Sequence, residues 1–148
     1  MFDRNRIPDL SNENLWRNDT RQGSVAIMKH AIDIQRVYEH TGDDGHVHFL
    51  VDRLWPRGIK KESLNLDGWL KDVAPSNVLR DWFGHDPQRW DEFRQRYEQE
   101  LDASPASWQA ILDVARKKPV TLFYGARDTE HNQAVVLRDF LMRKLHHG

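Results

Sequence analysis

Cysteine is missing from all 148 residues of the sequence. This absence excludes disulfides, thiolate metal sites, iron–sulfur clusters and cysteine nucleophiles. Long apolar runs are also missing, and no stretch approaches the roughly 20 apolar residues that a membrane-spanning helix needs. The N-terminus lacks the basic-then-apolar pattern of a secretory signal. Together these absences predict a cytoplasmic protein without a membrane partner.

The sequence has no large excess of charge of either sign. It contains 22 Lys and Arg against 23 Asp and Glu, a formal net charge of −1, and 30% of its residues are charged. A globally basic nucleic-acid-binding protein is therefore disfavoured, although a local basic patch is compatible with these numbers. The length suits one domain with a core large enough to need no metal or disulfide.

Periodicity is missing at the start of the chain and present afterwards. Residues 1–27 are polar and aperiodic, which predicts a loosely ordered N-terminal extension. Residues 28–148 are predicted to form a single α/β domain. Strands are expected around 32–37, 47–51 and 120–124, with the Gly- and Asp-rich stretch 39–46 as a turn or hairpin loop.

The helices are predicted from apolar spacing and from capping residues. A short helix is expected within 63–76, then a capped helical turn over 76–83 that ends at Gly84, and amphipathic helices after Asp86 and after Pro105. A final helix is predicted from Glu130 to about Leu145 with Asp128 or Thr129 as its cap. The alternation of strands and helices predicts a small mixed β-sheet flanked by helices, a layered α/β sandwich.

The stretch VDRLWPRG, residues 51–58, begins like the end of a buried strand and continues with charged residues. Asp52, Arg53, Trp55 and Arg57 fall at the strand end, where α/β sheets usually bind ligands. Arginine offers a planar fork to carboxylate or phosphate, and tryptophan can stack on a ring. The alternative is structural: an Asp52–arginine ion pair would pin a loop and Trp55 would plug the core. The residue types alone favour neither interpretation.

A second candidate stretch, FYGARDTEHNQA, follows the last strand. It places Tyr124 and Arg127 just before a helix N-terminus, which favours an anion, and His131 and Asn132 in the first turn of that helix. The alternative is an ordinary capped turn with Asp128 as the cap. If the two strands are neighbours in the sheet, both stretches meet at one edge.

The eight histidines predict little. His46 and His48 would point to one face of a strand, but no His-Glu-x-x-His or Glu-x-x-His pattern supports a metal site, and we predict no metal-binding residue. Dinucleotide-binding, P-loop and Gly-x-Ser-x-Gly motifs are absent. No helix-turn-helix with a basic recognition face is visible.

The segments VDRLWPRGIKKESLNLDGWLKDVAPS (51–76) and LFYGARDTEHNQAVVLRDFL (122–141) resemble the YeaO-like branch of the domain of unknown function 488 family. The resemblance runs from about Ile32 to Leu145 and implies a bacterial or archaeal, soluble α/β protein without an agreed activity. The broader family typically has a cysteine at the end of the last strand and a Cys-His pair at the following helix. This chain has Tyr124 near the first position and His131-Asn132-Gln133 at the second, so thiol chemistry does not transfer.

The most recognisable family motifs coincide with the two candidate stretches, which favours one shared site. We predict that the site binds or acts on an anionic small molecule, such as a nucleotide or another phosphate-containing compound; the sequence implies no particular cofactor. The predicted ligand-binding residues are Arg53, Trp55, Arg57, Tyr124, Arg127 and Asn132, and the predicted catalytic residues are Asp52 and His131. The alternatives are a nucleic-acid-binding or regulatory module, and a structural or protein-interaction domain.

Overall fold

The computed structural model describes residues 32–39 and 44–147. The predicted extension 1–27 and the predicted start of the domain at residue 28 lie outside these residues. The strands are β1 (Ile32–Arg36), β2 (Val47–Leu50), β3 (Gly68–Trp69) and β4 (Val120–Tyr124), and the helices are α2 (Asn77–Phe83), α3 (Trp90–Ala103), α4 (Gln109–Ala115) and α5 (Gln133–His147). The predicted single-domain α/β fold is confirmed for the part of the chain that the structure describes. No helix in that part is long and apolar enough to cross a membrane.

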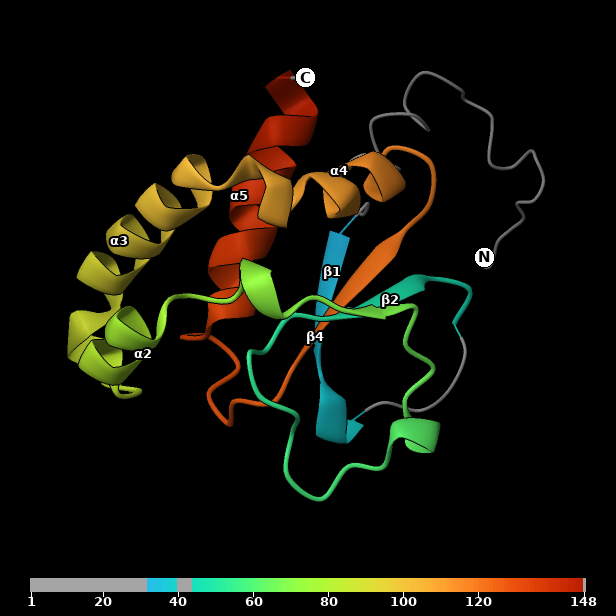
Figure 1. The fold of residues 1–148 in the computed structure, drawn as a ribbon, viewed down its shortest axis with the longest axis horizontal. Coiled ribbons are helices and arrows are strands. Elements are labelled where there is room, and N and C mark those ends of the chain that lie inside the picture. Colours follow the sequence, from blue (N-terminus) through green and yellow to red (C-terminus); the bar gives the residue numbers. More distant parts are fainter. Residues whose placement is uncertain (1–31, 40–43, 148) are drawn as a thin grey trace. The chain divides into compact units, whose positions relative to one another are not determined.

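The four strands form one sheet in the order β1-β4-β2-β3 (Figure 1). Every pairing is parallel, so the prediction of a mixed sheet is wrong. Of the turn and the hairpin loop expected after β1, the hairpin is wrong, because β4 lies between β1 and β2. The physical reason is visible in β4: all five of its residues are buried, which suits a central strand with a neighbour on each edge.

Each helix covers apolar surface, although some predicted boundaries shift. In α3 the residues Phe93, Tyr97 and Leu101 are buried, as the apolar spacing predicts. Ser76 caps α2 by accepting a hydrogen bond from the Leu79 N–H, and Gly84 ends it in the left-handed conformation. The short helix expected within 63–76 is replaced by β3 and two 3₁₀ turns.

An irregular segment after β2 builds a second small core against the sheet. Its buried members are Val37, Leu50, Leu64 and Phe123, and the half-buried side chains packed on them are Trp55, Ile59, Leu66 and Trp69. Backbone pairing also continues beyond β2, since the Val51 N–H donates to the Phe123 carbonyl at 3.0 Å. The loops after β2 and β4 therefore leave the sheet side by side, at the edge where parallel strands end together.

Candidate functional site

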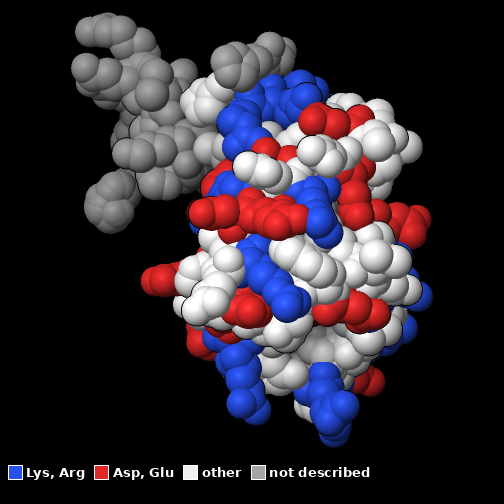
Figure 2. Space-filling view, turned by 90° about the vertical axis from the view of Figure 1, so that its left-hand side faces the viewer, with Lys and Arg blue, Asp and Glu red and all other residues white. Residues whose placement is uncertain are grey.

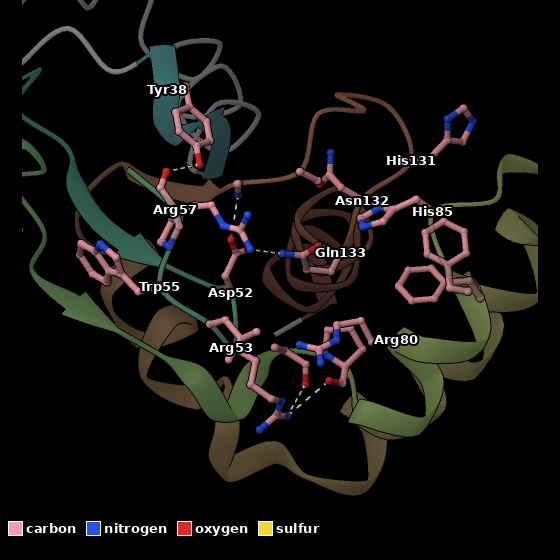
Figure 3. Close-up of a pocket in the computed structure, with 18 residues that line it drawn as sticks. Tyr38, Asp52, Arg53, Trp55, Arg57, Arg80, His85, His131, Asn132 and Gln133 are labelled. Carbon is pink, nitrogen blue, oxygen red and sulfur yellow. Dashed lines mark hydrogen bonds between the residues drawn. The ribbon is translucent and has the colours of Figure 1, made fainter. Parts of the chain in front are cut away.

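A cavity of about 300 Å³ lies at the carboxyl ends of β2 and β4 (Figure 3). The loops after these strands meet helix α2 and the start of α5 around it. Its lining residues are Tyr38, Asp52, Arg53, Leu54, Trp55, Pro56, Arg57, Ala74, Pro75, Arg80, Phe83, His85, Phe93, Gly125, Ala126, His131, Asn132 and Gln133. The assumption that the two candidate strands are neighbours is confirmed by their pairing.

Asp52 connects three elements at the floor of the cavity. Its Oδ2 accepts the Gly125 N–H at 2.8 Å, and its Oδ1 accepts the side-chain amide of Gln133. Its own carbonyl accepts the indole N–H of Trp69 at 2.8 Å. Burial raises the pKa of Asp52 to about 6, against the opposing effect of the hydrogen bonds from Gly125 and Gln133. Asp52 is thus a carboxylate held by neutral donors.

Three arginines line the cavity. Arg53 donates from Nη2 to the carbonyls of Ala74 and Pro75, at 3.1 and 3.4 Å, while its buried Nε has no partner among the described residues. Arg57 is exposed; its carbonyl accepts the Tyr38 hydroxyl at 2.7 Å. Arg80 reaches the cavity from α2, as the labelled side chains in Figure 3 show.

The described arginines fall into two groups, those that form an ion pair with a carboxylate and those that do not. Six described arginines lie within 4.0 Å of a carboxylate oxygen: Arg89, Arg94, Arg96, Arg116, Arg138 and Arg143. Figure 2 views the α2 and α3 side of the molecule and shows basic and acidic side chains interleaved over it. Of the carboxylates that the structure describes, none lies this close to Arg36, Arg53, Arg57, Arg80 or Arg127. Three of these, Arg53, Arg57 and Arg80, line the cavity, and none of them forms an ion pair with a carboxylate that the structure describes.

Trp55 is a fixed wall of the cavity. Its indole N–H donates to the Ile59 carbonyl at 2.6 Å, and its ring meets Trp69 edge-on with 5.3 Å between the centroids. Trp55 also packs against the buried cluster of Val37, Leu50, Leu64 and Phe123. The structural interpretation of Trp55 therefore accounts for most of its contacts, and its stacking on a ligand stays a prediction.

His131 is paired with a carboxylate that the sequence suggested only as a cap. Its Nδ1 lies 2.9 Å from Asp128 Oδ2, and its ring meets Trp90 edge-on at 5.1 Å. Asp128 caps the turn before α5 by accepting the N–H groups of Glu130 and His131. Helix α5 itself begins at Gln133, and Asn132 caps it by accepting the Val135 N–H at 3.2 Å. The predicted orienting role of Asn132 is thus directed toward its own helix.

Six of the eight predicted residues line the cavity, namely Asp52, Arg53, Trp55, Arg57, His131 and Asn132. Tyr124 is buried in β4, and burial raises its pKa; Arg127 is exposed, and neither belongs to the lining. Asp52 does not lie within ion-pair distance of any described arginine, so the predicted loop-pinning ion pair is not observed.

Three lining residues, Arg80, His85 and Gln133, have no direct functional signal in the sequence. Arg80 falls in the predicted helical turn over 76–83, and Gln133 falls near the start of the predicted last helix. His85 follows the αL residue Gly84 and has a φ of 59°, a conformation in which a residue with a Cβ is strained. A Gly-His pair directly after a predicted helix end was the one available hint.

The two histidines near β2 are engaged in hydrogen bonds. The Nδ1 of His46 lies 2.9 Å from Thr121 Oγ1, and the Nε2 of His48 lies 2.7 Å from Asp44 Oδ1. Among the described residues no group of three or more His, Asp or Glu side chains is arranged to hold a metal ion.

Fold and site define a class: a small, parallel α/β domain with an arginine-lined pocket at the carboxyl ends of its strands. Within that class, the chain belongs to the YeaO-like domain of unknown function 488 family, because the family model described as "Inactive DUF488-N3 subclade" matches residues 31–148. The chain is 42% identical over 110 residues to uncharacterized protein YeaO of Escherichia coli strain K12, covering 74% of this chain and 96% of YeaO.

Two mycobacterial proteins are also similar. Uncharacterized protein Rv3073c of Mycobacterium tuberculosis and uncharacterized protein Mb3100c of Mycobacterium bovis are each 39% identical over 110 residues, 74% of this chain and 92% of each relative. No solved structure matches the chain. The resemblance seen in the sequence is confirmed at the level of the family.

Proposed function

We propose that this protein binds a small anionic molecule in the strand-end cavity and does not convert it. The observation that supports this most strongly is that no described carboxylate oxygen lies within 4.0 Å of Arg53, Arg57 or Arg80, although Asp52 lines the same cavity, whereas six arginines elsewhere have such partners. Arginine forks suit phosphate and carboxylate, and a partly desolvated guanidinium gains most from an anion when it has no internal partner. A phosphate-containing ligand, such as a nucleotide, fits this description.

The volume and setting of the cavity agree with a small ligand. About 300 Å³ is at the lower end of the range for ligand pockets. The N-terminus of the 15-residue α5 adds backbone N–H groups on the same side, since Asn132 and Gln133 belong to the lining. The walls include apolar side chains such as Phe83, Phe93 and Pro56, which exclude water and strengthen charge–charge attraction.

Binding without turnover is favoured by three observations. The chain has no cysteine to act as a nucleophile, and the family model that it matches is described as an inactive subclade. Asp52 and His131 are already tied to neighbouring groups, to Gly125 and Gln133 in one case and to Asp128 in the other. The predicted catalytic use of Asp52 and His131 stays a prediction. The nucleic-acid alternative needs Trp55 as an open stacking platform, which its contacts with Ile59 and Trp69 disfavour.

The test is a thermal-shift and calorimetry panel of inorganic phosphate, pyrophosphate, AMP and a short single-stranded oligonucleotide, against potassium chloride at matched ionic strength. An anion at about 100 times its Kd adds about 2.7 kcal/mol to the unfolding free energy, a shift of several degrees in Tm. We expect Arg57→Gln and Arg80→Gln to weaken binding about tenfold each, because a charge-assisted hydrogen bond is worth about 1.5–3 kcal/mol.

The matched control is Arg143→Gln, which removes an exposed arginine that is paired with Glu98 at 2.9 Å. Binding that is equally sensitive to Arg143→Gln, or no stabilisation by any small anion, contradicts the proposal. Chromatography of the incubated anions should recover them unchanged. Turnover that is lost in Asp52→Asn would replace binding by catalysis, and preference for the oligonucleotide would support the nucleic-acid alternative.

A further inference from the structure

Asp52 is the one Asp or Glu among the residues that line the cavity, and the groups that hydrogen-bond to its side chain are neutral. One oxygen accepts the Gly125 N–H at 2.8 Å and the other accepts the Gln133 amide. No described lysine, arginine or histidine lies within ion-pair distance of it. A buried carboxylate is costly unless hydrogen bonds compensate, and two neutral donors leave part of its acceptor capacity open.

Gln133 adds an acceptor beside Asp52. It uses one amide N–H on Asp52, which leaves its carbonyl oxygen as an acceptor for a ligand and its second N–H as a donor. In Figure 3 Asp52 and Gln133 face each other in the middle of the labelled side chains, with Arg53 and Arg80 on one side. The pocket thus combines a hydrogen-bond-donating set of arginines with a hydrogen-bond-accepting pair, Asp52 and Gln133.

A ligand that satisfies both sets needs an anionic group and, some distance away, hydrogen-bond donors. An ammonium group would suit the carboxylate, but it would enter a pocket lined by three arginines, none of which lies within 4.0 Å of a described carboxylate oxygen. Hydroxyl groups donate to a carboxylate without adding positive charge. Two adjacent hydroxyls match the two oxygens of one carboxylate, and an acidic residue at a strand end serves this purpose for ribose in other α/β sheets.

We propose that the pocket selects an anion that carries a vicinal diol, a pentose phosphate or a ribonucleoside monophosphate, with its phosphate on the arginines and its diol on Asp52. This inference rests on the proposed anion-binding function. A cavity of about 300 Å³ accommodates one such molecule. Asp52 is then a specificity residue, because it distinguishes ribose from deoxyribose, while Arg57 and Arg80 supply affinity for any phosphate.

The experiment compares the affinities of AMP, 2′-deoxy-AMP, ribose 5-phosphate and inorganic phosphate by calorimetry with the full chain. We expect AMP to bind roughly tenfold or more tightly than 2′-deoxy-AMP, and ribose 5-phosphate to bind roughly tenfold or more tightly than inorganic phosphate. The reason is that a site built for a hydroxyl penalises the ligand that lacks it. Tighter binding of AMP than of ribose 5-phosphate identifies a nucleotide, and equal binding identifies the sugar phosphate as the recognised unit.

Asp52→Asn should remove the preference for ribose and keep binding of inorganic phosphate, whereas Arg57→Gln should weaken all four ligands alike. Equal affinity for AMP and 2′-deoxy-AMP in the unaltered protein overturns the inference even if Asp52→Asn does not fold. A preference for ribose that persists in folded Asp52→Asn overturns it as well. With either outcome, binding of inorganic phosphate would still support the proposed anion-binding function. Only the absence of binding of all four anions contradicts both that function and the preference for a diol.

Discussion

The arginines on the helical face of α3 and α5 differ from those at the strand ends in what neutralises them. On the helical face Arg94 lies 3.3 Å from Asp139, and Arg143 lies 2.9 Å from Glu98. At the strand ends Arg57 and Arg80 have no described carboxylate partner. Arginine is therefore paired within the protein in one region and lacks a described ion-pair partner in the other. An arginine without such a partner costs the folded state little only where water or a ligand solvates its charge.

The largest expected effect comes from giving the strand-end arginines an internal carboxylate. Leu54 lines the cavity and is 65% exposed, so Leu54→Glu places a carboxylate beside these arginines at little cost to folding. We expect the affinity for inorganic phosphate to fall at least about tenfold, because the new carboxylate competes for the same guanidinium groups. Calorimetric titration with phosphate measures the change.

Val78→Glu is the matched control, since Val78 is 81% exposed on α2 and does not line the cavity. An equal loss of phosphate affinity in Val78→Glu would mean that net charge, and not pairing within the pocket, decides binding.

The next effect concerns Asp52, which lacks the cationic partner that acids on the helical face have. Its folded-state pKa is raised from 3.8 to about 6, so between these values the folded protein holds a proton that the unfolded chain has released. The stability from this group is therefore highest at low pH and is lost as the pH rises through about 6. From about pH 7.5 to about pH 5 we expect the protein to gain about 1 kcal/mol from it.

Urea denaturation at both pH values, for the unaltered protein and for Asp52→Asn, isolates this gain. The variant cannot titrate at this position. The unfolding free energy of the unaltered protein, relative to that of Asp52→Asn, should therefore be larger at the lower pH. A difference that is the same at both pH values would show that Asp52 keeps an ordinary pKa.

The smallest effect is expected on the helical face. Glu98→Gln removes the carboxylate shared by Arg143 at 2.9 Å and Arg94 at 3.9 Å. Exposed ion pairs contribute about 0.2–1 kcal/mol and are screened by salt, so we expect a loss within that range that shrinks at high ionic strength. The variant should gain no affinity for phosphate, because the freed guanidinium groups stay hydrated. Thermal unfolding at low and high salt, with and without phosphate, checks both expectations, and phosphate binding in the variant would remove the contrast between the two regions.

Local sequence patterns predict the elements of this fold better than their arrangement. The apolar run at 120–124 and the apolar spacing of Phe93, Tyr97 and Leu101 are each visible within one short stretch of sequence. The structure contains both of the elements that they predict, β4 and α3. The parallel pairing of β4 with both β1 and β2 is set by contacts across some 70 to 90 positions, which no local pattern contains. The mixed sheet and the hairpin were wrong for this reason.

The candidate site shows the same division. Asp52, Arg53 and Arg57 were predicted because a strand end that suddenly becomes charged is a local signal. Arg80 and Gln133 were missed because only the docking of α2 and α5 at the strand ends brings them to the cavity. That no described carboxylate lies within 4.0 Å of Arg57 or Arg80 could not be predicted either, because it depends on how all the described elements pack around the cavity.

The position of β4 has a consequence for synthesis of the chain. It is the strand that joins β1 to β2, yet its residues, Val120–Tyr124, come last among the four strands. Until they leave the ribosome, β1 and β2 have no common partner, and their backbone N–H and C=O groups remain open to other chains. A nascent or truncated polypeptide that stops before residue 120 is therefore expected to need chaperone protection, and completion of the sheet is a late, long-range event in folding.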